Sequence, residues 1–75
     1  MSKLPVISSL ELIKYLSKKG YRHVHTSGSH HILVCPKNNK RISVPERDEL
    51  GKGLLRAILA ECGIEPDVFI REWNG

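Results

Sequence analysis

Residues 21–45, YRHVHTSGSHHILVCPKNNKRISVP, decide the fold of this 75-residue chain. Three runs within this stretch are rich in strand-forming residues and contain no glycine. The runs are residues 21–26, 30–35 and 41–45. Two segments rich in turn-forming residues, 27–29 and 36–40, separate them. Because short turns join antiparallel strands, the stretch predicts a three-stranded antiparallel meander.

A helix is predicted on each side of this meander. Upstream, Ser8-Ser9-Leu10-Glu11 has the spacing of a capping box, and Gly20 is a natural stop for the helix that follows. Downstream, residues 46–53 are predicted to be a polar loop, and a second helix is predicted over residues 54–62. Its buried stripe consists of Leu54, Leu55, Ile58, Leu59 and Cys62.

The predicted order is therefore α-β-β-β-α, an α+β fold, with a short third helix that begins at Pro66. Both major helices should cover one face of the sheet, because an amphipathic helix must bury its apolar stripe. The other sheet face, or the sheet edge, then stays available for a partner. A chain of this length fits a single small domain, so residues 1–75 are expected to form one unit.

Charge is distributed unevenly in this chain, which carries a net charge of +4. No acidic residue occurs between Glu11 and Glu46. The same interval holds all four histidines and seven basic residues: Lys14, Lys18, Lys19, Arg22, Lys37, Lys40 and Arg41. A strongly positive side of the molecule would suit the binding of phosphates. Charge alone is equally consistent with a solvated lysine surface.

Composition restricts the class of protein. No apolar run approaches the roughly 20 residues that a membrane helix needs. The first residues lack an apolar block followed by a small-residue cleavage site, so they are not expected to be a signal peptide. Cys35 and Cys62 are expected to be reduced thiols of a cytoplasmic protein and not a disulfide.

Two kinds of catalytic site are disfavoured by the motifs. His23 and His25 share a strand face, and Cys35 could approach them, but no CxxC, HxxxH or HExxH pattern completes a metal site. No GxSxG motif supports a Ser–His–acid hydrolase.

The adjacent pair His30 and His31 is the main candidate for chemistry. On a strand the two rings point to opposite faces, and alternation does not decide which ring is partly buried. Imidazole exchanges protons at neutral pH, and RNA supplies its own nucleophile, the 2′-hydroxyl. Backbone N–H groups at Gly28 and Ser29 could approach a phosphate. Composition alone still favours two surface histidines.

An ordered set of short motifs runs through nearly the whole chain. The set is Lys3-Leu4-Pro5, Gly20-Tyr21, Gly28-Ser29-His30-His31, Val44-Pro45, residues 53–59 (GLLRAIL) and Gly63-Ile64. In this order the motifs resemble the HicA family of toxin proteins from bacterial and archaeal toxin–antitoxin pairs. The chain departs from the pattern at His25, where members often carry Arg, at Leu54, where Thr is common, and at Glu46-Arg47-Asp48, where many members place a histidine.

The resemblance implies a fold like the double-stranded RNA-binding domain and the activity of an mRNA interferase. Such a toxin of a type II toxin–antitoxin system is a metal-independent endoribonuclease that cleaves mRNA and inhibits translation. The resemblance also implies that His30 is the general acid–base, with His31 as the alternative, that no cofactor is used, and that a HicB antitoxin is the partner.

The residues expected to hold RNA combine the turn, the neighbouring histidine and the nearby cations. They are Gly28, Ser29, His31, Lys19, Arg22, Lys37, Arg41 and Lys52. Two other functions remain open from the sequence: an RNA-binding module without catalysis, and a module that binds only protein.

Overall fold

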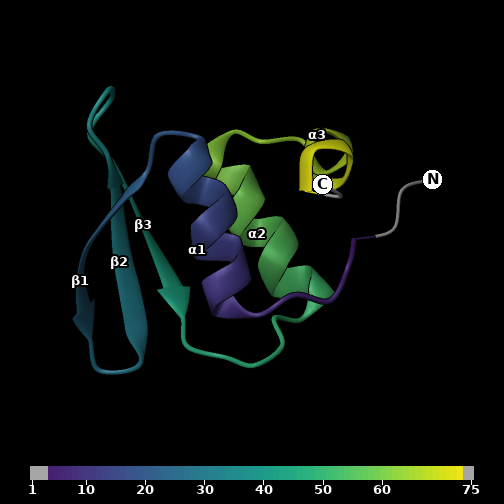
Figure 1. Cartoon of the computed structure of the whole chain (residues 1–75), viewed down its shortest axis with the longest axis horizontal. Coiled ribbons are helices and arrows are strands. Elements are labelled where there is room, and N and C mark those ends of the chain that lie inside the picture. Colours follow the sequence, from purple (N-terminus) through teal and green to yellow (C-terminus); the bar gives the residue numbers. More distant parts are fainter. Residues whose placement is uncertain (1–3, 74–75) are drawn as a thin grey trace.

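The computed structural model describes residues 4–73, so Lys3 of the motif set lies outside the described part. Three helices and three strands follow one another in the predicted α-β-β-β-α order, with an additional C-terminal helix (Figure 1). They are α1 (Ser9–Lys18), β1 (Arg22–Ser27), β2 (His30–Cys35), β3 (Lys40–Pro45), α2 (Lys52–Cys62) and α3 (Pro66–Trp73). The predicted α+β fold is confirmed.

The strands form an antiparallel sheet in the order β1-β2-β3. In the central strand, His31 pairs with Thr26 on β1 and with Val44 on β3. The register of β1 shifts between His23 and His25, so β1 carries an irregularity of the β-bulge type. Bulges bend a strand and change the direction of its side chains.

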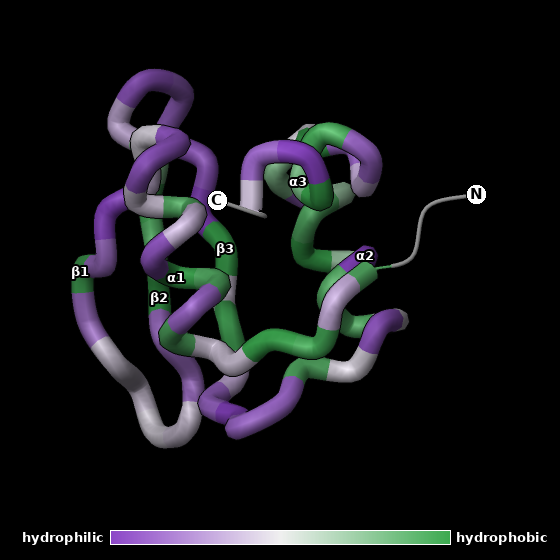
Figure 2. The backbone as a smooth tube through the Cα atoms, turned by 45° about the vertical axis from the view of Figure 1, so that its right-hand side comes forward, coloured by the Kyte–Doolittle hydropathy of each residue, from purple (hydrophilic) through white to green (hydrophobic). Residues whose placement is uncertain are grey.

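Both major helices lie on one side of the sheet, as predicted. Figure 1 shows α1 and α2 side by side, with α3 beyond α2. Contacts of α1 reach β1 and β3, whereas α2 contacts β3 and α3. The hydrophobic stretches coloured green in Figure 2 lie mainly in the helices and in β2 and β3. Strand β1 is different, because all six of its residues are exposed.

The core lies between the sheet and the helices. Its fully buried apolar side chains include Leu12, Leu16, Leu33, Val44, Leu55, Leu59 and Phe69. Truncating a leucine in such a site to alanine typically costs about 2–5 kcal/mol of stability. Phe69 extends this core to α3, and its ring packs edge-on against Tyr15 at 4.8 Å between centroids.

The capping box that was predicted for α1 is present. The Glu11 amide donates to the Ser8 hydroxyl at 3.2 Å, and the Ser8 amide donates to the Glu11 carboxylate at 2.9 Å. The β1–β2 connection has two residues, and Gly28 has a φ of +60° in it. A positive φ at the first position suits a type II′ hairpin turn, and glycine adopts it without steric cost.

Several predicted boundaries were wrong. Helix α2 begins at Lys52, two residues earlier than expected, and the segment 46–53 is not wholly polar. Leu50 in this segment is 1% exposed and pairs with Ile7, whose carbonyl accepts its amide at 2.8 Å. Strand β1 starts one residue late, because the Tyr21 amide donates to Leu16 at the end of α1.

Candidate active site

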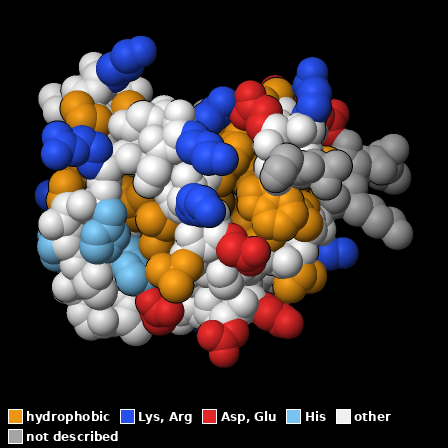
Figure 3. Space-filling view, in the orientation of Figure 1, with side chains coloured by type: hydrophobic (Ala, Val, Ile, Leu, Met, Phe, Trp, Pro, Cys, Tyr) orange, Lys and Arg blue, Asp and Glu red, His pale blue; other side chains and the backbone are white. Residues whose placement is uncertain are grey.

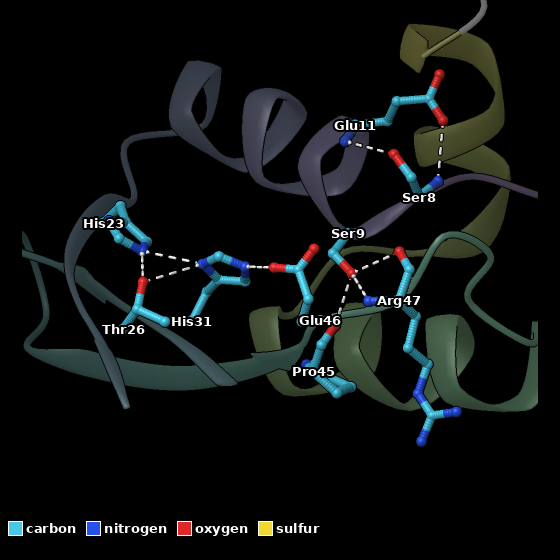
Figure 4. A network of polar contacts seen from close by, with 9 residues as sticks. All are labelled: Ser8, Ser9, Glu11, His23, Thr26, His31, Pro45, Glu46 and Arg47. Carbon is cyan, nitrogen blue, oxygen red and sulfur yellow. Dashed lines mark hydrogen bonds and ion pairs between the residues drawn. The ribbon is translucent and has the colours of Figure 1, made fainter. Parts of the chain in front are cut away.

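The His31 imidazole is at the centre of a chain of four polar side chains (Figure 4). On one side, its Nε2 contacts a carboxylate oxygen of Glu46. On the other side, its Nδ1 lies 3.2 Å from Nε2 of His23 and 3.3 Å from the hydroxyl of Thr26. His23 Nε2 and the Thr26 hydroxyl are 3.1 Å apart. An acid, an imidazole and two further proton-carrying groups therefore form one connected cluster.

The bulge at Val24 brings His23 into this cluster. In a regular strand, residues three apart point to opposite faces, so His23 and Thr26 would be separated. The register shift between His23 and His25 cancels that alternation. His23 then shares a face with Thr26 and with His31, which is the cross-strand partner of Thr26.

Ser9, the first residue of α1, controls the backbone around Glu46. Its side chain is fully buried, and its hydroxyl lies 2.7 Å from the Pro45 carbonyl and 2.9 Å from the Arg47 carbonyl. The Arg47 amide donates to the same hydroxyl. The Glu46 amide donates to the Ser29 carbonyl at 2.6 Å. The backbone on both sides of Glu46 is thus held, which fixes the position from which its side chain reaches His31.

This geometry assigns the protons of His31. An ionised carboxylate can only accept, so the Nε2 of His31 carries the proton that Glu46 accepts. In the neutral ring Nδ1 is then unprotonated, and it accepts from His23 or from Thr26. His31 is only 12% exposed at its side chain, whereas Glu46 is 51% exposed. The ring is held in one orientation, with a basic nitrogen directed away from the carboxylate.

His30 lies on the opposite face of the sheet, with Ile32 and Val34. The prediction that the two adjacent histidines separate is confirmed, and the partly buried ring is that of His31. His30 is exposed, and within residues 4–73 its ring makes no hydrogen bond or ion pair. The structure therefore gives His31 a set of partners and leaves the His30 ring in solvent.

Two arginines mark this outer face of the sheet. Arg22 on β1 and Arg41 on β3 both pair with Val34, so they flank the central strand. None of the three strands contains an acidic residue. Val34 is three residues from His31, or about 10 Å at the usual rise per residue. Figure 3 shows histidine side chains on the sheet side of the molecule, with Lys and Arg side chains nearer its upper end.

The other residues predicted to hold RNA are dispersed. Gly28 and Ser29 form the turn beside His31, whereas Lys37 lies in the turn at the other end of β2. Lys52 is exposed at the start of α2. Lys19 forms an ion pair with Glu72 on α3, with 2.7 Å between Nζ and Oε1.

Glu72 also accepts a hydrogen bond from the Tyr15 hydroxyl at 2.8 Å. The hydrogen bonds from Lys19 and Tyr15 lower the pKa of the Glu72 carboxyl. Burial, followed by the hydrogen bond to Glu72, raises the pKa of Tyr15. Lys19 therefore serves first to attach α3 to α1.

Metal and disulfide chemistry find little support in the described residues. No group of three His, Cys, Asp or Glu side chains between residues 4 and 73 is placed to hold a metal ion. Cys35 and Cys62 are both free thiols, as expected. Burial raises the pKa of the Cys62 thiol, and Cys35 is buried. No helix within the described range is long and apolar enough to cross a membrane.

Four members of the site were not predicted as such from the sequence: His23, which was considered only as a metal ligand, and Ser9, Thr26 and Glu46. Ser9 falls on the apolar stripe of its helix, three residues before Leu12, and a polar residue there signals a buried hydrogen bond. Glu46 is the first acid after the long acid-free interval and directly follows a strand paired with His30 and His31. Thr26 carried no comparable signal, because it lies opposite His31 only when the β1–β2 turn has two residues, whereas three were predicted.

Comparison with protein families gives one match. A family model described as "HicA toxin of bacterial toxin-antitoxin" matches residues 10–64, well over half of the chain. Comparisons with curated proteins and with solved structures give no match. The matched range includes His23, Thr26, His31 and Glu46, and α3 follows it. The chain therefore belongs to the HicA family of toxins of bacterial toxin–antitoxin pairs.

Proposed function

We propose that this protein is an endoribonuclease that cleaves mRNA and thereby inhibits translation, as the toxin of a type II toxin–antitoxin pair. Family membership supports the toxin role. The observation that carries the ribonuclease assignment is the His31 ring, held between Glu46 and the pair His23–Thr26. Such an orientation is what a histidine needs to move a proton at a defined atom.

RNA suits this site because it brings its own nucleophile. His31 Nδ1 takes the proton of a 2′-hydroxyl, and the 2′-oxygen attacks the adjacent phosphorus. The bond from phosphorus to the 5′-oxygen breaks, which leaves a 2′,3′-cyclic phosphate and a 5′-hydroxyl end. The leaving 5′-oxygen takes up a proton as its bond to phosphorus breaks, so the reaction needs one group that removes a proton and one that supplies a proton. Charge that develops on the phosphate is stabilised by the backbone N–H groups of the hairpin turn.

The hairpin turn beside His31 is assigned to the phosphate that is cleaved, and the outer face, whose strands carry no acid, is assigned to the RNA that continues past the sheet edge. Arg22 and Arg41 offer two guanidinium groups at a spacing set by the sheet, and Gly28 and Ser29 offer backbone N–H groups close to His31. Contacts of this kind read the phosphate backbone and carry little sequence information. Recognition is therefore expected to be mostly by phosphate and shape.

The catalytic histidine is tested by two variants of adjacent residues. His30→Gln and His31→Gln are incubated with RNA in a buffer that contains a chelator. The family resemblance points to His30, whereas the contacts of the folded chain favour His31. We expect His31→Gln to lose cleavage and His30→Gln to retain most of it. The reverse result would return the catalytic role to His30.

An RNA-binding module without catalysis is the alternative. It predicts salt-sensitive binding to RNA that remains intact afterwards. Wild-type protein that binds RNA but leaves it uncut over a long incubation would falsify the ribonuclease proposal. The proposed protein partner is a HicB-type antitoxin that covers the site, and co-expression with the neighbouring reading frame should suppress both cleavage and toxicity.

A further inference from the structure

The bulge in β1 has no evident role in packing. Val24, at the register shift, is 51% exposed, and no residue of β1 is buried. The effect of the bulge is to direct His23 to the face of Thr26 and His31. Bulges are frequent next to active sites, where they redirect a side chain. The redirected side chain is an imidazole, which can both give and take a proton.

The RNA cleavage described above needs two proton transfers. One group must remove the proton of the 2′-hydroxyl, and another must protonate the 5′-oxygen as its bond to phosphorus breaks. His31 Nδ1 can perform the first transfer. Glu46 is an acceptor in its contact with His31, and a threonine hydroxyl is too weak an acid for the second transfer.

We propose that His23 is the second catalytic residue, the general acid that protonates the 5′-oxygen leaving group of RNA. This inference rests on the proposed ribonuclease function. His23 Nε2 lies 3.2 Å from His31 Nδ1, with ring centroids 5.2 Å apart. Acid and base are therefore within reach of one phosphodiester. His23 is exposed on the edge strand, so it can approach a bound substrate.

The same contact resets the site after each cleavage. His31 gains a proton at Nδ1 from the 2′-hydroxyl, and His23 loses a proton from Nε2 to the 5′-oxygen. The two nitrogens that exchange protons with substrate are those that face each other at 3.2 Å. Direct transfer from His31 to His23 restores both rings, with no net gain or loss of protons.

His25 provides the matched control. It lies on the same strand and is also exposed, but it pairs with Ile32 on the outer face. A glutamine at either position keeps a neutral hydrogen-bonding side chain and removes proton exchange. Neither residue contributes to the core, so circular dichroism and thermal melting should show folded protein for both variants.

The test uses two RNA oligonucleotides of the same sequence. In the second one, the 5′-oxygen of the scissile bond, mapped first on unmodified RNA, is replaced by sulfur. A thiolate leaves without protonation and so needs no general acid. We expect His23→Gln to cut ordinary RNA at least 100-fold more slowly than wild type and the sulfur-substituted RNA at a near wild-type rate. His31→Gln should lose both reactions, and His25→Gln should keep both.

The other outcomes each overturn a defined statement. If His23→Gln cuts ordinary RNA like wild type, or loses both reactions equally, His23 is not the general acid, while the proposed function stands. If wild-type protein cuts neither oligonucleotide, the proposed function fails and this inference fails with it.

Discussion

Two ends of the central strand differ in what they offer a substrate. At the His31 end, proton-carrying side chains contact one another on the helix-facing side. At the Val34 end, two arginines stand apart on the open side, without an acid on any of the three strands. The side chains at the His31 end can exchange protons with a substrate. The arginines at the Val34 end keep a fixed positive charge, which suits the binding of phosphate. Successive side chains of β2 point to opposite faces of the sheet. Neighbouring residues of this strand can therefore belong to different sites.

The largest effect is expected from a change at the His31 end alone. His31→Gln should lower the rate of RNA cleavage by about 10²–10⁴-fold, the range typical of general acid–base catalysis. Its affinity for RNA should stay close to that of wild type, because the arginines remain. Rates from labelled RNA and affinities from a filter or anisotropy assay separate the two quantities. A parallel loss of affinity would contradict the division of roles.

Ser9→Ala is expected to have the next largest effect. The change removes the buried hydroxyl that holds Pro45 and Arg47, and it leaves buried backbone groups without a partner. Stability should fall by about 1–3 kcal/mol, measured by urea unfolding. Because the backbone at Glu46 is released, cleavage should fall in the fully folded protein as well. Ser17→Ala, on the exposed side of the same helix, is the control and should change neither quantity.

A third change tests the phosphate-binding end. In the double variant Arg22→Gln with Arg41→Gln, binding to single-stranded RNA should weaken, and the salt dependence of its affinity should become shallower. Each phosphate contact contributes about 0.7 to the slope of log affinity against log salt, so the slope should fall by about 1.4. The rate at saturating RNA should hardly change. An unchanged slope would mean that these arginines do not contact phosphate.

The smallest effect is expected outside both groups of side chains, and it is a change of stability at alkaline pH. Burial, and then the hydrogen bond to Cys62, raises the pKa of Tyr21 to about 12 from its ordinary value of 10. A raised pKa means that the folded state favours the neutral phenol. The corresponding stability is fully present below pH 10 and is lost as the pH rises toward 12. Tyr21→Phe should show less loss of stability in this range, as followed by thermal melting at stepped pH.

The sequence predicted the order of the elements well because their signals are local. The capping box of α1, the two turns and the stripe of α2 each lie within a few neighbouring residues. Two boundaries failed for different reasons: the Tyr21 amide bonds to Leu16 in the local Schellman motif that Gly20 makes at the end of α1, whereas Leu50 is buried by a tertiary pairing with Ile7. The pairing of Leu50 with Ile7 cannot be inferred from neighbours along the chain, because more than 40 residues separate them.

The candidate site was harder to predict than the fold. Alternation indicated that His30 and His31 face opposite ways, but only the packed structure identifies His31 as the partly buried ring. The contact between His23 and His31 could not be predicted. In a regular strand the two side chains would point to opposite faces of the sheet, and only the bulge in β1 brings them to the same face. Glu46 was noted only as a departure from the family pattern, although the register of a meander brings the end of β3 to the start of β2.

The exposure of β1 has a consequence for how this protein would respond to heat or denaturant. His23 and Thr26 lie on a strand with no buried residue, whereas β2 and β3 contribute Leu33 and Val44 to the core. Such a strand opens locally at a lower free energy than the rest of the fold, and its amide protons exchange first. Mild stress would therefore separate His23 and Thr26 from His31 and Glu46 while the helices stay folded, so the proposed RNA cleavage is expected to be lost before the fold unfolds.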